Sequence, residues 1–523
     1  MAAAARKKVF PMTELNRLPF VNSLNSLTSA TFAKRPLAPL LAAGLLALMA
    51  GCSHQAIQPR LAALDASALG VDAAEPRPVS EDLSAWWTVC GDAQLDALIQ
   101  QALAGSPTIQ VAQTRLQRAQ AQEMLSSGAD KPQLQLTGEV DRQRFTEHGL
   151  YPHPVAGSTL TTGTLQLEGS WELDLFGKQR AEIEASIGQR RASEADLQAA
   201  RLLLSSQVAR QYVQLGRLQA QREVAVRALA QREEMLALIR QRVDAGLDTN
   251  VELRQGQGAV PDTRQQITAL DEQVNLARHA LAVLVGRAPK SLDDLNVSLD
   301  RLRTPDVPQS LPLDLLARRA DVMAARWRVE SARGMSDAAR ATFYPNIDLT
   351  SYAGYNAIGL SQVLKASSLQ WGLLPAIHLP LFDGDRRLAN LSVRVADQDA
   401  SVATYNQTVL QAVQEAVDQV DSVRSVARQQ SEQQAAQGHI ESAYDLATQR
   451  YRAGLGGYLT VLSAESAVLA QRRQAVDLKA RALDTRFSLI RAVGGTWLPP
   501  ATTAQPLVAP ITQNNPSLSG DRS

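Results

Sequence analysis

The sequence predicts an α+β protein with unusually long helices, and three observations predict it. Four short landmarks recur in the same order about 210 residues further along the chain, which indicates an internal duplication. Each half has a stretch without proline, 178–244 and 385–452, that is long enough for a helix of about 100 Å. Each half also has two segments that alternate apolar and polar residues with a period of two.

The duplication rests on four pairs of landmarks. They are Pro132-Gln133-Leu134 with Pro345-Asn346-Ile347, Leu175-Phe176-Gly177 with Leu381-Phe382-Asp383-Gly384, Arg242-Val243-Asp244-Ala245-Gly246-Leu247 with Arg450-Tyr451-Arg452-Ala453-Gly454-Leu455, and Val285-Gly286-Arg287 with Val493-Gly494-Gly495. We therefore divide the body of the chain into repeat 1, 85–287, and repeat 2, 311–495. Prolines mark 288–310 as the linker between the repeats.

Each repeat is predicted to contain the same elements in the same order: an opening helix, two strands, a long helix and a return helix. In repeat 1 these are strands 133–144 and 164–176, long helix 178–244 and return helix 247–285. In repeat 2 they are strands 346–355 and 368–381, long helix 385–452 and return helix 455–493. Gly256, Gly258 and Pro261 interrupt the first return helix and predict a kink or a break there.

The strands alternate as a membrane β-barrel requires, with apolar residues toward lipid and polar residues toward water. A half-buried strand of a soluble protein is the alternative. The predicted lipid-facing residues are Leu165, Leu167, Trp171, Leu173, Leu369, Trp371 and Leu373. Four strands cannot close a membrane barrel, so the strands must be shared between subunits. Two chains would give a filled barrel of eight strands and three chains a water-holding barrel of twelve, which favours a homotrimer.

The N-terminus is predicted to be a targeting segment. Lys34 and Arg35 precede the apolar run 36–49, which suits a signal peptide over 1–51. The run ends in Leu48-Met49-Ala50-Gly51-Cys52, which resembles the lipobox of bacterial lipoproteins. That resemblance implies diacylglycerol and an N-acyl chain on Cys52; a plain signal peptide is the alternative. Residues 52–84 are predicted to form a linker, and 496–523 a disordered tail.

Composition and motifs exclude several classes of function. A net charge of +1 gives no support for nucleic-acid binding. The six histidines are scattered and the two cysteines form no ligand cluster, so we expect no metal and no cofactor. Cys90 is interpreted as a small buried residue. No nucleophile or phosphate-loop motif is present, so we expect no enzyme. No apolar run reaches the length of a membrane-spanning helix.

Four short motifs, spread over about residues 80 to 497, resemble those of a known protein family. They are Trp86-Trp87 with Asp92 and Leu95, Leu311-Pro312 with Arg319-Ala320-Asp321, Phe343-Tyr344-Pro345-Asn346-Ile347, and Gly494-Gly495-Thr496-Trp497. Together with the lipobox and the doubled unit, they resemble the outer-membrane factor lipoproteins of the NodT type, which are similar to TolC.

The resemblance implies a TolC-like homotrimer in which four strands per chain build a shared twelve-stranded outer-membrane β-barrel on a long periplasmic α-helical barrel. The chain would be lipid-anchored in the outer membrane of a Gram-negative cell and extend into the periplasm. Its partners would be a periplasmic adaptor and an inner-membrane efflux transporter. Its function would be that of a passive duct that exports small toxic compounds. The segment 142–154 resembles a loop of a fusaric-acid-resistance subgroup, which favours aromatic acids among the cargo.

The two turns between long and return helices are the predicted docking sites. Gly246 and Gly454 suit left-handed helix stops, and Leu247 and Leu455 follow them directly. The resemblance implies that these tips contact the adaptor. The alternative is that each leucine packs on its own hairpin, as often happens at a helix C-cap.

The resemblance also implies a periplasmic gate at the same end. Leu459 falls on an apolar ring, Glu252 on an acidic position and Tyr451 on an aromatic that locks the closed state by hydrogen bonds between helices. Val251 and Ser463 are assigned to the same gate. Thr460 and Ser463 stand where relatives often carry aspartates, so the acidic ring is depleted. Plain helix packing is the alternative for Leu459.

Other classes of protein share some of these features. A periplasmic adaptor or scaffold lipoprotein would also be lipidated and helical, but it needs no lipid-facing strands. A duct of a type I secretion or metal-efflux system belongs to the same mechanical class.

Overall fold

The computed structural model describes residues 57–64, 81–304 and 318–495. The chain divides into two units, Met1–Ala56 and Ile57–Ser523, and every element described below belongs to the second. The predicted signal peptide, Cys52 and the tail 496–523 lie outside the described residues. The described residues also exclude Leu311-Pro312, Trp497 and most of the predicted N-terminal linker 52–84.

Repeat 1 begins with the 3-10 helix η2 (Glu81–Cys90), which is followed by four α-helices. These are α2 (Ala93–Gly105), α3 (Pro107–Ala129), α4 (Lys178–Asp244) and α5 (Asn250–Leu284). The predicted single opening helix is therefore two helices. Ser106 has extended backbone and Pro107 begins α3, because proline suits the first turn of a helix but cannot continue one.

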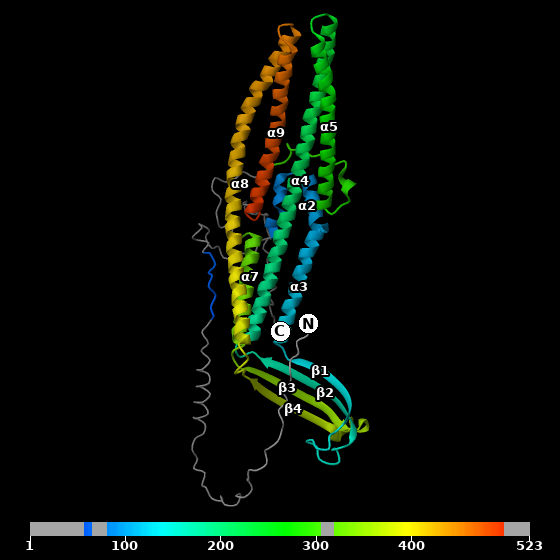
Figure 1. The fold of residues 1–523 in the computed structure, drawn as a ribbon, viewed down its shortest axis with the longest axis vertical. Coiled ribbons are helices and arrows are strands. Elements are labelled where there is room, and N and C mark those ends of the chain that lie inside the picture. The colour runs from blue at the N-terminus through cyan, green and yellow to red at the C-terminus, as the bar shows by residue number, and fades with distance from the viewer. Residues whose placement is uncertain (1–56, 65–80, 305–317, 496–523) are drawn as a thin grey trace, which may run out of the picture. The chain divides into compact units, whose positions relative to one another are not determined.

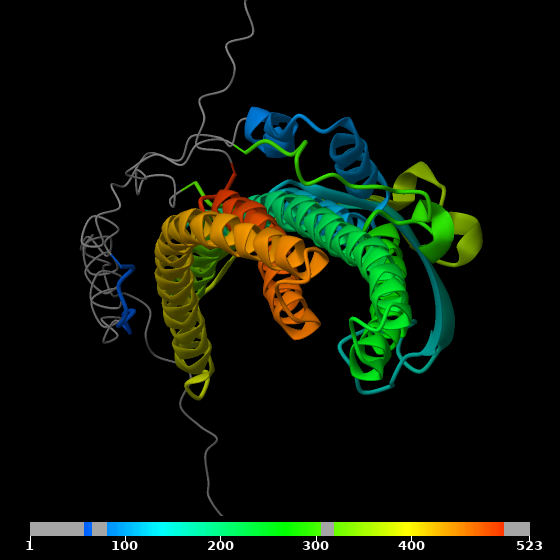
Figure 2. The same ribbon diagram turned by 90° about the horizontal axis from the view of Figure 1, so that it is seen from above.

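Repeat 2 follows the short 3-10 helix η3 (Pro289–Leu292). Its α-helices are α7 (Ala320–Ala341), α8 (Arg386–Arg452) and α9 (Tyr458–Ala492), and η4 (Leu360–Gln362) and η5 (Ala366–Ser368) lie in a strand connection. In both repeats the long helix turns back into its return helix, so α4 with α5 and α8 with α9 form two hairpins (Figures 1 and 2).

The strands form one antiparallel sheet in the order β1-β2-β3-β4, to which each repeat contributes two strands (Figure 1). They are β1 (Gln133–Arg144), β2 (Thr159–Leu173), β3 (Asn346–Ile358) and β4 (Leu369–His378). Strand β2 begins five residues before the predicted start, because its first residues pair with the end of β1. Strand β4 ends three residues before the predicted end, and Pro380, which lacks a backbone N–H, follows. The sheet leaves β1 and β4 as open edges.

The duplication is visible in the backbone. Gly177 and Gly384 precede the two long helices with φ of 79° and 62°, and Gly246 and Gly454 end them with φ of 72° and 74°. A side chain is strained in this left-handed region, which favours glycine there, although Asp385, the residue directly before α8, also adopts a φ of 63°.

Helix α5 runs unbroken from Asn250 to Leu284 although Pro261 lies inside it, so the predicted break does not occur. Gly256 faces α4 closely: a Cβ there would lie 3.1 Å from Ile239 and 3.2 Å from Leu236. This glycine therefore serves helix packing, which a sequence pattern cannot distinguish from helix breaking.

The largest apolar core joins η2, α2, α4, α5 and α9. Trp86 packs on Phe487 and donates its indole N–H to Ser205 Oγ at 3.0 Å. Cys90 lies in this core, and burial, with nearby Asp96 and Asp92, raises the pKa of its thiol to about 12. The thiol therefore stays protonated and unreactive at neutral pH, as a buried structural cysteine does.

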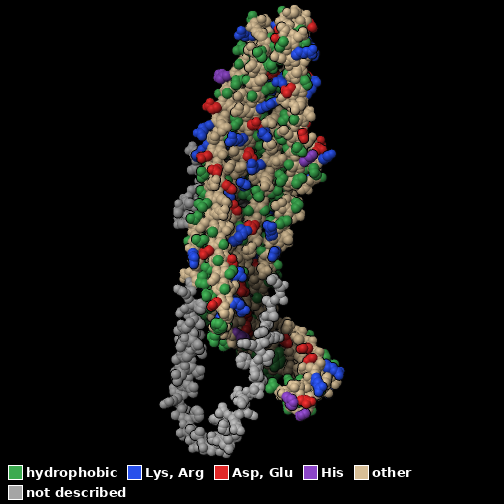
Figure 3. Space-filling view, in the orientation of Figure 1, with side chains coloured by type: hydrophobic (Ala, Val, Ile, Leu, Met, Phe, Trp, Pro, Cys, Tyr) green, Lys and Arg blue, Asp and Glu red, His purple; other side chains and the backbone are tan. Residues whose placement is uncertain are grey.

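The helical surface carries many charged side chains together with scattered exposed apolar ones. Figure 3 shows basic and acidic side chains interspersed along the helices on the face in view, without a separate basic patch. Among the helices of the described ranges, none combines the length and the apolar composition needed to cross a membrane.

Candidate functional site at the helical tips

Both tips are built by the same turn. The Leu247 N–H donates to Arg242 O at 2.8 Å, and the Leu455 N–H donates to Arg450 O at 2.8 Å. The N–H groups of Gly246 and Gly454 donate to the next carbonyl oxygens along the helix, those of Val243 and Tyr451. These paired bonds define a Schellman motif, which stops a helix cleanly and fixes the direction of the chain that leaves it.

The leucine after each glycine is exposed. Leu247 is 65% exposed and Leu455 is 70% exposed. Within the chain, therefore, neither leucine gains much from packing on its own hairpin. An apolar side chain held open by a rigid turn is available to a partner.

A polar cluster joins the two tips. The Tyr451 hydroxyl at the end of α8 donates to Asp248 Oδ2 in the turn after α4. Arg242 donates from Nε to the same oxygen at 2.9 Å, and its guanidinium lies 4.7 Å from the centre of the Tyr451 ring. We call Arg242, Asp248 and Tyr451 the tip triad. It links repeat 1 to repeat 2 by one carboxylate that receives two donors.

The protonation states of Asp248 and Tyr451 favour the hydrogen bond between them. Burial acts to raise the pKa of Asp248, but the hydrogen bonds from Arg242 and Tyr451 outweigh it and hold that pKa below its ordinary value. Burial, and then the hydrogen bond to Asp248, raises the pKa of the Tyr451 phenol. At neutral pH the carboxylate is charged and the phenol is protonated, which is the combination that the bond requires.

Glu252 has a local structural role. It forms a capping box with Thr249: its carboxylate accepts the Thr249 N–H at 2.9 Å, and the Thr249 hydroxyl accepts the Val251 N–H at 3.1 Å. The hydrogen bond from the Thr249 hydroxyl is the largest cause that lowers the pKa of Glu252. Glu252 thus stabilises the start of α5, and Asp248 is the acid that Tyr451 contacts.

The other predicted gate residues are exposed. Leu459 is 68% exposed and Val251 is 61% exposed, and Ser463 lies one helical turn beyond Leu459 on the exposed side of α9. Tyr458 and Val461, on the other side of α9, are buried in a cluster with Ile239 and Tyr451. Leu459 therefore does not pack within its own chain.

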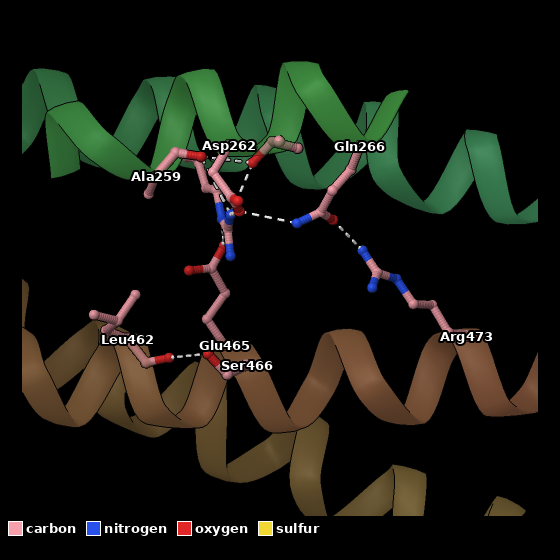
Figure 4. Close-up of polar contacts among 9 residues, drawn as sticks. Ala259, Asp262, Gln266, Leu462, Glu465, Ser466 and Arg473 are labelled. Carbon is pink, nitrogen blue, oxygen red and sulfur yellow. Dashed lines mark hydrogen bonds and ion pairs between the residues drawn. The ribbon is translucent and has the colours of Figure 1, made fainter. Parts of the chain in front are cut away.

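A second polar network lies deeper between the hairpins (Figure 4). Arg232 of α4 donates from Nε to Glu465 of α9 at 2.9 Å and from Nη1 to Thr263 of α5 at 2.7 Å. Asp262 lies 3.7 Å from the same guanidinium and accepts a hydrogen bond from Gln266. Arg232 and Glu465 are largely buried, so this ion pair fastens α9 to the first hairpin.

The predicted lipid-facing residues all lie on one face of the sheet. The uninterrupted register places Leu165 and Leu167 of β2 on the same side as Leu369, Trp371 and Leu373 of β4. Trp171 and Leu173 of β2 share that side. All except Leu173, which is half-buried, are exposed in the single chain. The opposite face is polar, and one hydrogen-bonded row crosses it through Gln370, Gln166, Glu168 and Gln135.

The sequence analysis assigned no role to Arg242 and Asp248 of the tip triad or to the members of the second network, chief among them Arg232 and Glu465. For Asp248 a signal exists, because the second residue after the tip glycine is an acid in repeat 1, whereas Gly456 holds that position in repeat 2. In the part of the chain that the structure describes, no group of three or more His, Cys, Asp or Glu residues is placed to hold a metal ion.

A four-stranded sheet with one apolar exposed face, carried on two long helical hairpins, defines the class of outer-membrane channels. The chain belongs to the outer membrane efflux protein family, whose model matches residues 98–287 and 311–495. These two segments end at the last residues of the two repeats. The protein is an outer-membrane channel for efflux.

Named relatives agree with this assignment. The chain is 32% identical over 463 residues to the multidrug resistance outer membrane protein MdtQ of Escherichia coli O6:H1, covering 87% of this chain and 97% of the relative. It is 36% identical to the fusaric acid resistance protein FusA of Burkholderia cepacia, covering 66% of each. The crystal structure of the outer membrane protein VceC from Vibrio cholerae matches with a TM-score of 0.74 and 33% identity, covering 79% of this chain and 98% of VceC.

Proposed function

We propose that three copies of this chain form a passive, TolC-like duct that is closed at its periplasmic tips and opened by partners. The observation that carries the proposal is the sheet, which has one exposed apolar face and two open edges, β1 and β4. An open edge is not tolerated in a bilayer. Pairing of β1 with β4 of a neighbouring copy removes every edge when three chains close a ring of twelve strands.

The lipid anchor belongs to the same proposal. Cys52 carries the acyl chains, and the described segment 57–64, which follows it in the sequence, lies along α8. Ile57 packs on Leu391 near the beginning of α8, which is the end that follows the sheet. The Arg60 and Leu61 N–H groups donate to Asp399, which fastens this segment along α8.

The tips dock an adaptor and close the duct. Leu247 and Leu455 contact the periplasmic adaptor, which connects the duct to an inner-membrane transporter. Leu459, Val251 and Ser463 line the gate, and the apolar ring of Leu459 blocks ions by excluding water. Within each subunit the tip triad holds the hairpins together, so opening requires that Tyr451 release Asp248.

The cargo consists of small toxic compounds. The relatives are named for multidrug resistance and fusaric acid resistance, which supports drugs and aromatic acids as exported classes. The duct itself needs no cofactor and performs no chemistry, because export requires only a water-filled path and an external source of energy.

Single-channel conductance of the purified protein in planar bilayers tests the gate. Leu459→Ala widens the apolar ring and is expected to raise the conductance of the closed channel. Leu276→Ala is the matched control, because Leu276 is an exposed leucine of α5 that lies 26 positions, about 39 Å along the helix, from its start at the tip. Equal conductance of wild type and Leu459→Ala would remove Leu459 from the gate.

A further inference from the structure

The outer end of the sheet, away from the helices, carries a cationic rim on its apolar face. Strands β1 and β2 pair without interruption, so Arg142 lies opposite Thr161 and Arg144 opposite Thr159. Side chains alternate along a strand, which places both arginines on the same face as Leu136. Along β1 the apolar face therefore ends in two guanidinium groups.

At the outer end of β1, positive side chains lie on the apolar face and negative side chains lie on the polar face. Glu139 and Asp141 alternate with the arginines and lie on the polar face. Arg144 has only a long contact of 3.9 Å to Glu147, and both side chains are largely exposed. Within the described ranges Arg142 has no carboxylate partner. Exposed pairs of this kind contribute little, so both cations are available to a ligand.

The connection between β3 and β4 covers the same face. A Cβ on Gly163 would lie 2.6 Å from Val363 and 3.1 Å from Leu360, so this connection rests directly on the apolar side of β2. Leu360 and Leu364 are exposed nonetheless, and the exposed Lys365 follows them. Apolar and cationic side chains thus alternate at the outer end of the apolar face, as in an element that lies at a membrane interface.

We propose that Arg142, Arg144 and Lys365 bind the phosphates of lipids in the outer leaflet, while Leu360 and Leu364 enter its acyl region. We call these five residues the lipid rim. A guanidinium donates two parallel hydrogen bonds to a phosphate, and a lysine adds a point charge. Between Leu173 and Gly163, strand β2 rises roughly 33 Å, which at a tilt of about 40° spans the roughly 25 Å apolar band of a membrane barrel. The rim therefore lies at headgroup level. This inference rests on the proposed membrane insertion of the sheet.

Binding of fluorescent diphosphoryl lipid A to the full-length protein in neutral detergent tests the lipid rim. Wild type is expected to bind, and Arg142→Gln/Arg144→Gln to bind about thirtyfold more weakly. Arg115→Gln/Arg118→Gln is the matched control, because it removes two exposed arginines from α3, outside the sheet. Arg142→Lys/Arg144→Lys keeps the charges and is expected to retain most of the affinity. Intact oligomer on gels shows that each variant is folded.

Equal binding by wild type and Arg142→Gln/Arg144→Gln would overturn the proposal. Competition by inorganic phosphate as strong as by unlabelled lipid A would also overturn it, because the site would then recognise free phosphate. Insertion into phosphatidylcholine vesicles distinguishes failure of the lipid rim from failure of the proposed membrane insertion of the sheet. Wild type that enters the vesicles while its rim variant binds lipid A normally contradicts only the rim. Wild type that enters no vesicle contradicts the proposed membrane barrel.

Discussion

Asp248 is the acceptor on which the tip triad depends. Its carboxylate receives hydrogen bonds from both Arg242 and Tyr451, and hydrogen bonds to a buried charged group contribute about 1.5–3 kcal/mol each. Asp248→Asn keeps the size of the side chain but removes the charge. We expect this variant to open more easily, which would raise the uptake of an antibiotic too large for general porins.

Glu252→Gln is the control for that experiment. It makes the same charge change in the same turn, but glutamine still serves in a capping box. Sensitivity to the antibiotic should therefore stay at the wild-type level. If Glu252→Gln leaks and Asp248→Asn does not, Glu252 is the gating acid and the tip triad is only structural.

The tip triad also predicts a response to acid. The pKa of Asp248 in the folded protein lies below its ordinary value of 3.8, so its stabilising contribution is complete above 3.8 and is lost as the pH falls through the lowered pKa. We expect channel conductance to rise as the pH falls below 3.8 in the wild type. In Asp248→Asn this rise should be absent, and a rise of equal size would assign it to another group.

Arg232 and Glu465 form the ion pair that fastens α9 to the first hairpin. Because both side chains are largely buried, loss of Glu465 leaves Arg232 with only its longer ion pair to Asp262 at 3.7 Å, and the lost charged hydrogen bond costs about 1.5–3 kcal/mol. Glu465→Gln is expected to lower the midpoint of thermal unfolding clearly. Glu441→Gln, in the more exposed pair with Arg472 within the second hairpin, should lower it little. Equal shifts in the unfolding midpoint would show that the pair between the hairpins stabilises the fold no more than the exposed pair does.

At the scale of elements, the turns present leucines for docking. Leu247→Asp together with Leu455→Asp places charges on two exposed positions, so the fold should be kept while contact with an apolar groove is lost. We expect efflux-dependent drug resistance to fall to the level of a strain without the channel, with normal amounts of oligomer in the outer membrane. Leu276→Asp is the charged control, because Leu276 is an exposed leucine of α5 that lies 26 positions from the start of that helix at the tip. Full resistance in the double variant would exclude docking through these leucines.

The long elements were the most predictable part of the fold. Helix α4 spans Lys178–Asp244, the range expected from its freedom from proline and its flanking glycines, and β1 spans the range that alternation indicates. Strand ends were less predictable, because pairing with a neighbour decides where a strand begins. Thr159 to Gly163 belong to β2 because they pair with Val140 to Arg144. Pro107 divides the opening helix although apolar periodicity continues across it.

The position of the two helical turns was predictable, but the contacts within them were not. The glycine turns located the tips, and the leucines after them were found from their position alone. The partner of Tyr451 was missed, because Asp248 stands outside the acidic positions that the resemblance indicated. Arg232 and Glu465 are 233 positions apart, so only the packing of α4 against α9 brings them together. No local pattern marks a pair of this kind.

At the scale of the whole molecule, a single chain leaves surfaces exposed that a complete channel would bury. Its sheet has two open edges, and most of the large side chains on its apolar face are exposed. Two further exposed apolar residues, Leu410 and Val417, lie two turns apart on one face of α8. The proposed trimer would cover these surfaces together.

The oligomeric state of the protein extracted from outer-membrane fractions tests this claim most directly. Gel mobility before and after heating, together with the mass of the detergent-solubilised particle, separates a trimer from a monomer. The account predicts a detergent-stable trimer that dissociates only on heating. A soluble monomer released by removal of the lipid anchor would contradict the shared barrel and would favour a periplasmic adaptor or scaffold.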